Sequence, residues 1–170
     1  MKVHSIDSNS FKAKLNIENV KSNTVKMQNI ARLFSEKTME YSAAEMYILP
    51  RDIDAKFQPG GVSIYAYENN HPAEVTIAEL PKEVWEKLLS YSDSFISNKL
   101  TKMFKLCCNL NRDINHAYDD ATFLVKRYGD NGDFLQTREN LFGPVREYMK
   151  QSVKDQIAND KILSTWNICI

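Results

Sequence analysis

An unbroken seven-residue hydrophobic repeat is the most regular feature of this chain. Its alternating steps of four and three residues keep one stripe of a long α-helix apolar, so that stripe must be buried against a neighbour. Ser92 or Asp93 can cap the start of this helix, and Gly129 can end it. The stripe consists of Ile96, Leu100, Met103, Cys107, Leu110, Ile114, Ala117, Ala121, Leu124 and Tyr128.

This stripe is too wide for a two-stranded coiled coil. Heptad position e, which usually carries a charge in such coils, holds Phe104, Tyr118 and Val125. A helix of this kind is typical of a bundle, in which neighbours cover two sides. We expect an antiparallel helix to cover one end, and either the first half of the chain or a second copy to cover the end near residues 95–106.

The returning helix is predicted over about residues 144–158, after a turn at residues 129–133. Pro144 either kinks this helix or marks its true start. The residues that follow, 162–170, are apolar and aromatic, and form either a strand or an anchored end. The apolar face of the returning helix is expected to consist of Leu141, Val145, Tyr148, Met149, Val153 and Ile157.

The first half of the chain has β-type alternation and one helical segment. Residues 11–18 alternate apolar and polar side chains, residues 24–40 have a helical pattern, and residues 45–49 form a short strand. Two further alternating runs predict a β-hairpin over 61–79. The predicted fold is α+β: a small antiparallel sheet with one helix, followed by a long antiparallel helical hairpin. Residues 1–80 and 81–170 are the two predicted units, sharing one core because the first unit is thin.

The charge of the chain is balanced. The formal net charge is zero, and residues 1–80 carry 9 basic and 10 acidic residues. This balance weighs against non-specific binding to nucleic acid or to an anionic membrane. No run of 18 apolar residues is present, so we expect no membrane-spanning helix. Two of the three cysteines are adjacent in sequence, which is a poor disulfide framework and favours a reducing compartment, the cytoplasm.

The residues with chemical potential do not form a recognised catalytic pattern. Cys107 is expected in the core and Cys108 at the surface, and adjacent helical cysteines diverge too far to act as a redox pair. Asp113, His116 and Asp120 lie on one helix, but the returning helix supplies no histidine to complete a metal site. We therefore predict no catalytic set, no metal and no cofactor.

The leading functional hypothesis is a non-enzymatic interaction or assembly protein that binds a protein partner or itself. It would use the long helix or the tyrosine face of the sheet. The abundance of lysine and asparagine is typical of an AT-rich genome and suggests a bacterial or phage source, which would place the chain in host cytoplasm or a virion. The predicted partner-binding residues are Tyr65, Tyr67, Lys99, Lys102, Lys105 and Phe123.

Two alternatives belong to other functional classes. The first is a small enzyme with a cleft between the sheet and the helical hairpin, lined by Tyr65, Tyr67, His71, Asp113 or His116. The second is a nucleic-acid-binding protein that uses the basic edge of the long helix formed by the three lysines named above.

Overall fold

The computed structural model describes six segments of the chain: residues 13–17, 24–41, 44–50, 61–68, 71–129 and 132–168. Side chains at 67–68, 71–77 and 168 lie outside this description. The elements follow the order β1 (Lys14–Ile17), α1 (Thr24–Lys37), β2 (Ala44–Pro50), β3 (Val62–Glu68), β4 (His71–Leu80), α2 (Lys82–Leu89), α3 (Asp93–Tyr128), α4 (Phe134–Ala158), η1 (Leu163–Thr165) and β5 (Asn167–Ile168).

One sheet contains strands from both the N-terminal and the C-terminal parts of the described chain. In the described residues its five strands lie in the order β1-β2-β3-β4-β5. The β2–β3, β3–β4 and β4–β5 pairs are antiparallel. The sheet is mixed rather than wholly antiparallel because β1 runs parallel to β2, a pairing that needs a crossover connection such as α1. The apolar C-terminal tail supplies β5, which pairs with Ala78 and Glu79.

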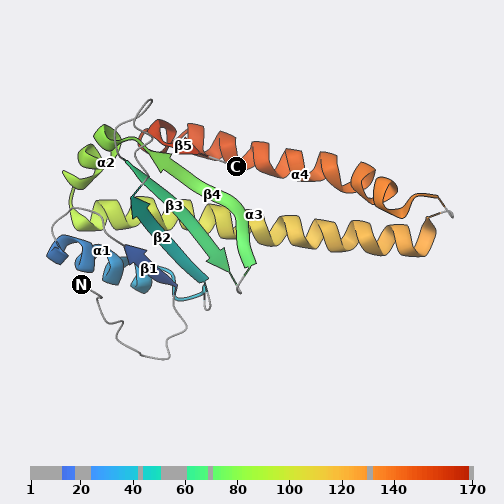
Figure 1. Ribbon diagram of the computed structural model, residues 1–170, viewed down its shortest axis with the longest axis horizontal. Helices are drawn as coiled ribbons and strands as arrows, with labels where there is room; N and C mark the ends of the chain where they lie inside the picture. The colour runs from blue at the N-terminus through green and yellow to red at the C-terminus, as the bar shows by residue number, and fades with distance from the viewer. Residues whose placement is uncertain are drawn as a thin grey trace.

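The helices lie against one face of this sheet. Alternate side chains of the central strands are buried, including Met46, Ile48 and Ile64, because they face the helices. Figure 1 shows α3 crossing behind the strands, with α1 beside its first turns and α4 returning antiparallel to it. A single hydrophobic cluster extends from Ala13 to Trp166 and so draws on both halves of the chain.

The long helix has the limits that the heptad predicts, and the α+β fold with a long helical hairpin is confirmed. Helix α3 contains 36 residues. The Ser92 hydroxyl accepts a hydrogen bond from the Phe95 amide at its start, and Gly129 donates to the Val125 carbonyl at its end. The sheet and α1 cover its first half, where Ile96, Leu100 and Met103 are fully buried.

The returning helix is longer than the sequence pattern predicts. Helix α4 begins at Phe134, where the Asp133 carboxylate accepts from the amides of Leu135 and Gln136. Pro144 therefore lies inside the helix. Proline has no amide hydrogen, so Pro144 cannot donate to the Asn140 carbonyl as other helical residues would. Both residues are exposed, so water can solvate that carbonyl instead.

Gly61, just before β3, is expected to tolerate no side chain. A Cβ at this position would lie 1.9 Å from the Leu80 carbonyl oxygen, which belongs to the backbone and cannot rotate away. Replacing Gly61 with alanine should lower the free energy of unfolding by about 1–3 kcal/mol, measured by urea denaturation. Gly132→Ala is the matched control because no atom lies within 4 Å of its added Cβ. Equal losses in the two variants would contradict this explanation.

Candidate protein-interaction surface

The second half of α3 extends past the sheet together with the first half of α4 (Figure 1). We call this projecting part, residues 115–128 of α3 and 134–148 of α4, the arm. Aromatic rings from both helices and one arginine side chain pack between them. The Tyr118 and Phe142 rings meet edge to face with centroids 5.4 Å apart, and the Arg138 guanidinium lies 4.4 Å from the Tyr118 ring centroid. Ala121 and Val125 are buried in the same contact.

Helix α4 occupies only one side of the wide apolar stripe. The buried arm residues of α3, Ala121 and Val125, are at heptad positions a and e. At position d, Ala117 still packs against the core, but Leu124 does not. Leu124, at d, is 46% exposed, and Tyr128, at the end of the stripe, is 70% exposed. The earlier members of the stripe are buried or half-buried. The prediction that the stripe is covered is therefore confirmed for the first half of α3 and wrong for its end.

The outward face of α4 is also apolar. The expected packing face is wrong at Leu141, Val145 and Tyr148, which are exposed, while Phe142 takes the inward position. These three residues follow each other at steps of four and three and form a second stripe, rotated from the one that carries Phe142 and Val153. Sequence spacing alone contains both stripes and does not show which one meets α3.

The exposed apolar side chains of the molecule concentrate on the arm. Ten large hydrophobic side chains are exposed in the described part of the chain, and eight of them are on the arm. Large exposed apolar areas on proteins often mark binding sites, so this concentration makes the arm the candidate for one. We call these eight residues the arm surface: Tyr118, Phe123, Leu124, Tyr128, Leu135, Leu141, Val145 and Tyr148.

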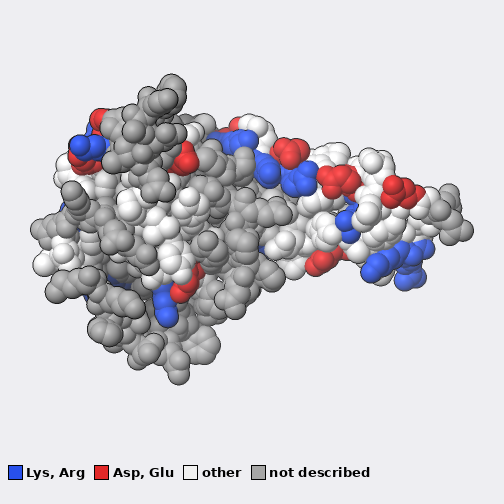
Figure 2. Space-filling view, viewed as in Figure 1, with Lys and Arg blue, Asp and Glu red and all other residues white. Residues whose placement is uncertain are grey.

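Charged groups of both signs lie along the arm (Figure 2). On α3 the acidic Asp119 and Asp120 precede the basic Lys126 and Arg127. The Arg127 guanidinium lies 5.8 Å from the Phe123 ring centroid and 5.6 Å from that of Tyr128. Aromatic rings beside arginine are the combination enriched at the energetic centres of protein interfaces. Of the predicted partner-binding residues, Phe123 is the one on this surface, with a side chain 56% exposed.

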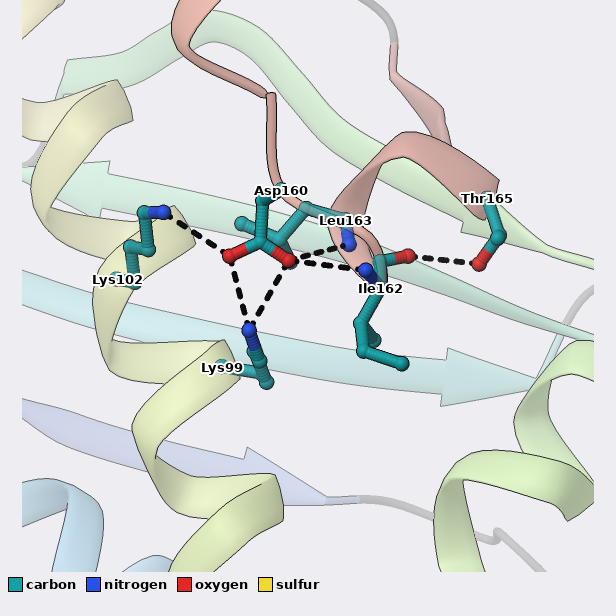
Figure 3. Close-up of polar contacts among 6 residues, drawn as sticks. All are labelled: Lys99, Lys102, Asp160, Ile162, Leu163 and Thr165. Atoms are coloured by element: carbon teal, nitrogen blue, oxygen red, sulfur yellow. Dashed lines mark hydrogen bonds and ion pairs between the residues drawn. The ribbon is translucent and has the colours of Figure 1, made fainter. Parts of the chain in front are cut away.

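The predicted basic edge is paired with carboxylates of the same chain. Lys99 and Lys102 both donate to Asp160, with Nζ–Oδ2 distances of 2.8 and 3.0 Å (Figure 3). Lys105 pairs with Glu40. These lysines connect α3 to other parts of the fold, and a phosphate would have to compete with the carboxylates.

The sequence patterns did not predict a role for Asp160. Its carboxylate also accepts from the backbone amides of Ile162 and Leu163, so it holds the turn that leads into η1 as well as binding two lysines (Figure 3). Burial favours a higher pKa, but the hydrogen bonds from Lys99, Leu163, Lys102 and Ile162 outweigh it and hold the pKa of Asp160 well below its usual range. An aspartate whose side chain can accept from the amide two residues further on is a turn signal that the sequence contains.

Tyr65, on the predicted tyrosine face of the sheet, is less exposed than the residues of the arm surface. Tyr65 is half-buried on β3, opposite Tyr47 of β2 and Thr76 of β4. The side chains of Tyr67 and His71 lie outside the described residues. Asp113 and His116 are exposed on α3. Two shallow hollows, of about 610 Å³ beside Lys37 and about 280 Å³ beside Tyr148, are lined by none of Tyr65, Asp113 and His116.

The two neighbouring cysteines are both in the core. Cys107 is fully buried, and burial raises the pKa of its thiol to about 12. The prediction that Cys108 lies at the surface is wrong, because only 2% of the residue is exposed. The turn after α1 covers this side of α3, where the Tyr41 and Phe104 rings meet. Because its pKa is so high, the Cys107 thiol is not a nucleophile at neutral pH.

Among the described residues, no group of three or more His, Cys, Asp or Glu side chains is placed to hold a metal ion. None of the helices described combines the length and the apolar character that crossing a bilayer requires.

Comparison of the chain with protein-family models, curated proteins and solved structures found no match.

Proposed function

We propose that this chain is a non-enzymatic interaction or assembly protein that binds another protein chain through the arm surface. The observation that carries the proposal is the concentration of exposed apolar side chains on one projecting hairpin. Burying Phe123, Leu124 and the α4 stripe against a partner would remove apolar area from water, the main driving force of protein association. Because two paired helices already fix the backbone that carries these side chains, binding would require ordering of side chains but little ordering of the backbone.

The composition of the arm surface also supports a protein partner. Three tyrosines and one phenylalanine supply large contact areas, and Arg127 stays beside two of these rings. Charged residues of both signs lie along the arm as well (Figure 2), and such residues can form the polar rim of an interface. The lysine edge lacks such support for nucleic-acid binding, since its ammonium groups are paired internally.

Photo-crosslinking in cells that produce the protein tests this proposal. The full chain would carry a benzophenone amino acid at position 123 or 148, both of which are on the arm surface. The matched control carries it at Lys87, which is exposed on α2 at the other end of the molecule. We expect defined protein adducts from positions 123 and 148 and none from position 87.

The adducts also identify the kind of partner by mass. The chain has a mass of 19.6 kDa, so an adduct of two copies runs at about twice that value, and the peptides in the adduct distinguish it from a different partner of similar mass. If both arm positions give no adduct, or give the same adducts as position 87, the arm is not an interaction surface and the proposed function fails.

A further inference from the structure

The outer face of α3 in the arm has an order of side chains that is complementary to itself. Asp120, Phe123, Leu124 and Arg127 follow at steps of three, one and three residues, which places them on one face over about two helical turns. Reversing the direction of the helix exchanges Asp120 with Arg127 and Phe123 with Leu124. The acid at one end of the set is thus matched by the base at the other.

A two-fold symmetric contact requires this kind of surface, because the same patch meets itself. We propose that the partner of the arm is a second copy of this chain, docked antiparallel along α3 with the two-fold axis between residues 123 and 124. This inference rests on the proposed function and names its partner. Phe123 and Leu124 of each copy form the apolar centre, and two Asp120–Arg127 pairs flank it.

The charged side chains are in position to make these pairs. Arg127 lies beside Phe123 and Tyr128, so its guanidinium stays along the same face as the apolar centre. Within the described part of the chain, neither Asp120 nor Arg127 forms an ion pair. Both groups can therefore pair across the contact without breaking an internal bridge.

Electrostatics also selects the direction of docking. A parallel arrangement of the same faces in register places Asp120 against Asp120 and Arg127 against Arg127, and like charges in an interface are strongly disfavoured. The antiparallel arrangement replaces both repulsions with attractions. One helix face buries less than a standard interface, so we expect dissociation in about the micromolar range.

Sedimentation equilibrium of the purified full chain tests the inference through charge reversal. Wild type should form dimers, and Asp120→Arg or Arg127→Asp alone should each weaken dimerisation about tenfold or more, because each creates two like-charge contacts. The double variant D120R/R127D should recover the wild-type dissociation constant to within about threefold, since it restores both pairs with exchanged signs.

Asp155→Arg is the matched control. It makes the same charge change at an exposed residue of α4 that lies outside the arm, and should alter the dissociation constant less than about twofold. A wild type that stays monomeric to about 500 µM, a double variant as weak as the single ones, or an equal effect of Asp155→Arg overturns the inference. The proposed function is judged separately, because a crosslinked adduct with a different protein would support it even where the wild type stays monomeric.

Discussion

Replacing Phe104 with alanine is expected to lower the free energy of unfolding by about 3–5 kcal/mol. Phe104 is fully buried on α3. Its ring meets Phe34 of α1 at a centroid distance of 5.1 Å and Tyr41 at 5.4 Å, both edge to face. The substitution removes these contacts and leaves a cavity where α1 and α3 meet. Urea denaturation followed by circular dichroism measures the loss.

Phe123→Ala is the control for this experiment, because it makes the same chemical change on the same helix. Phe123 is 56% exposed, so its loss should change the free energy of unfolding by less than about 1 kcal/mol. The two variants should separate stability from binding: F104A unfolds more easily, and F123A weakens association through the arm surface. A large loss of stability in F123A would mean that the arm is held together by this ring instead of presenting it to a partner.

The sequence predicts the long helix well because its signals are local. The heptad, the Ser92 cap and Gly129 all act within a few turns, and α3 has the limits that they indicate. The β-hairpin is also predicted from local signals, because the alternation of apolar and polar residues within β3 and β4 does not depend on the rest of the chain. These parts of the fold depend little on distant residues.

The parts that the sequence could not predict depend on distant residues. The direction of β1 is not encoded in its alternation, which is the same for parallel and antiparallel pairing. The stripe of α3 is apolar at positions a, d and e, so spacing does not decide which side α4 takes. The outcome leaves Leu124 exposed and produces the arm surface.

The lysine edge illustrates the same limit for the candidate site. A run of lysines on a helix looks like a free basic surface when the chain is read alone. Lys99 and Lys102 are instead paired with Asp160, about 60 residues further along the chain. No local pattern connects these positions, so the pairing appears only when the C-terminal segment folds back on α3.

Replacing Asp160 with asparagine should lower the free energy of unfolding at pH 7 by about 2–4 kcal/mol. The Asp160 side chain is only 7% exposed and accepts from two lysines and two backbone amides. Asparagine keeps the shape but loses the charge, and its amide donor would point at a lysine ammonium or a backbone amide. Both lysines would then lack a counter-charge, and the segment that contains η1 and β5 would be less firmly held to α3.

The pH dependence of the same variant gives a second readout with a definite sign. Because the pKa of Asp160 in the folded chain lies below its usual value of about 3.9, the stabilisation from its charge is present above that value and is lost as the pH falls. Wild type and Asp160→Asn should therefore differ most above about pH 5, and the difference should shrink steadily as the pH falls below about 4, because the unfolded wild-type chain then binds a proton at this carboxylate that the folded chain does not. Glu40→Gln is the control, since Glu40 is 57% exposed beside Lys105 and exposed pairs contribute little. A constant difference between wild type and Asp160→Asn across this range would mean that the shape of Asp160 matters and its charge does not.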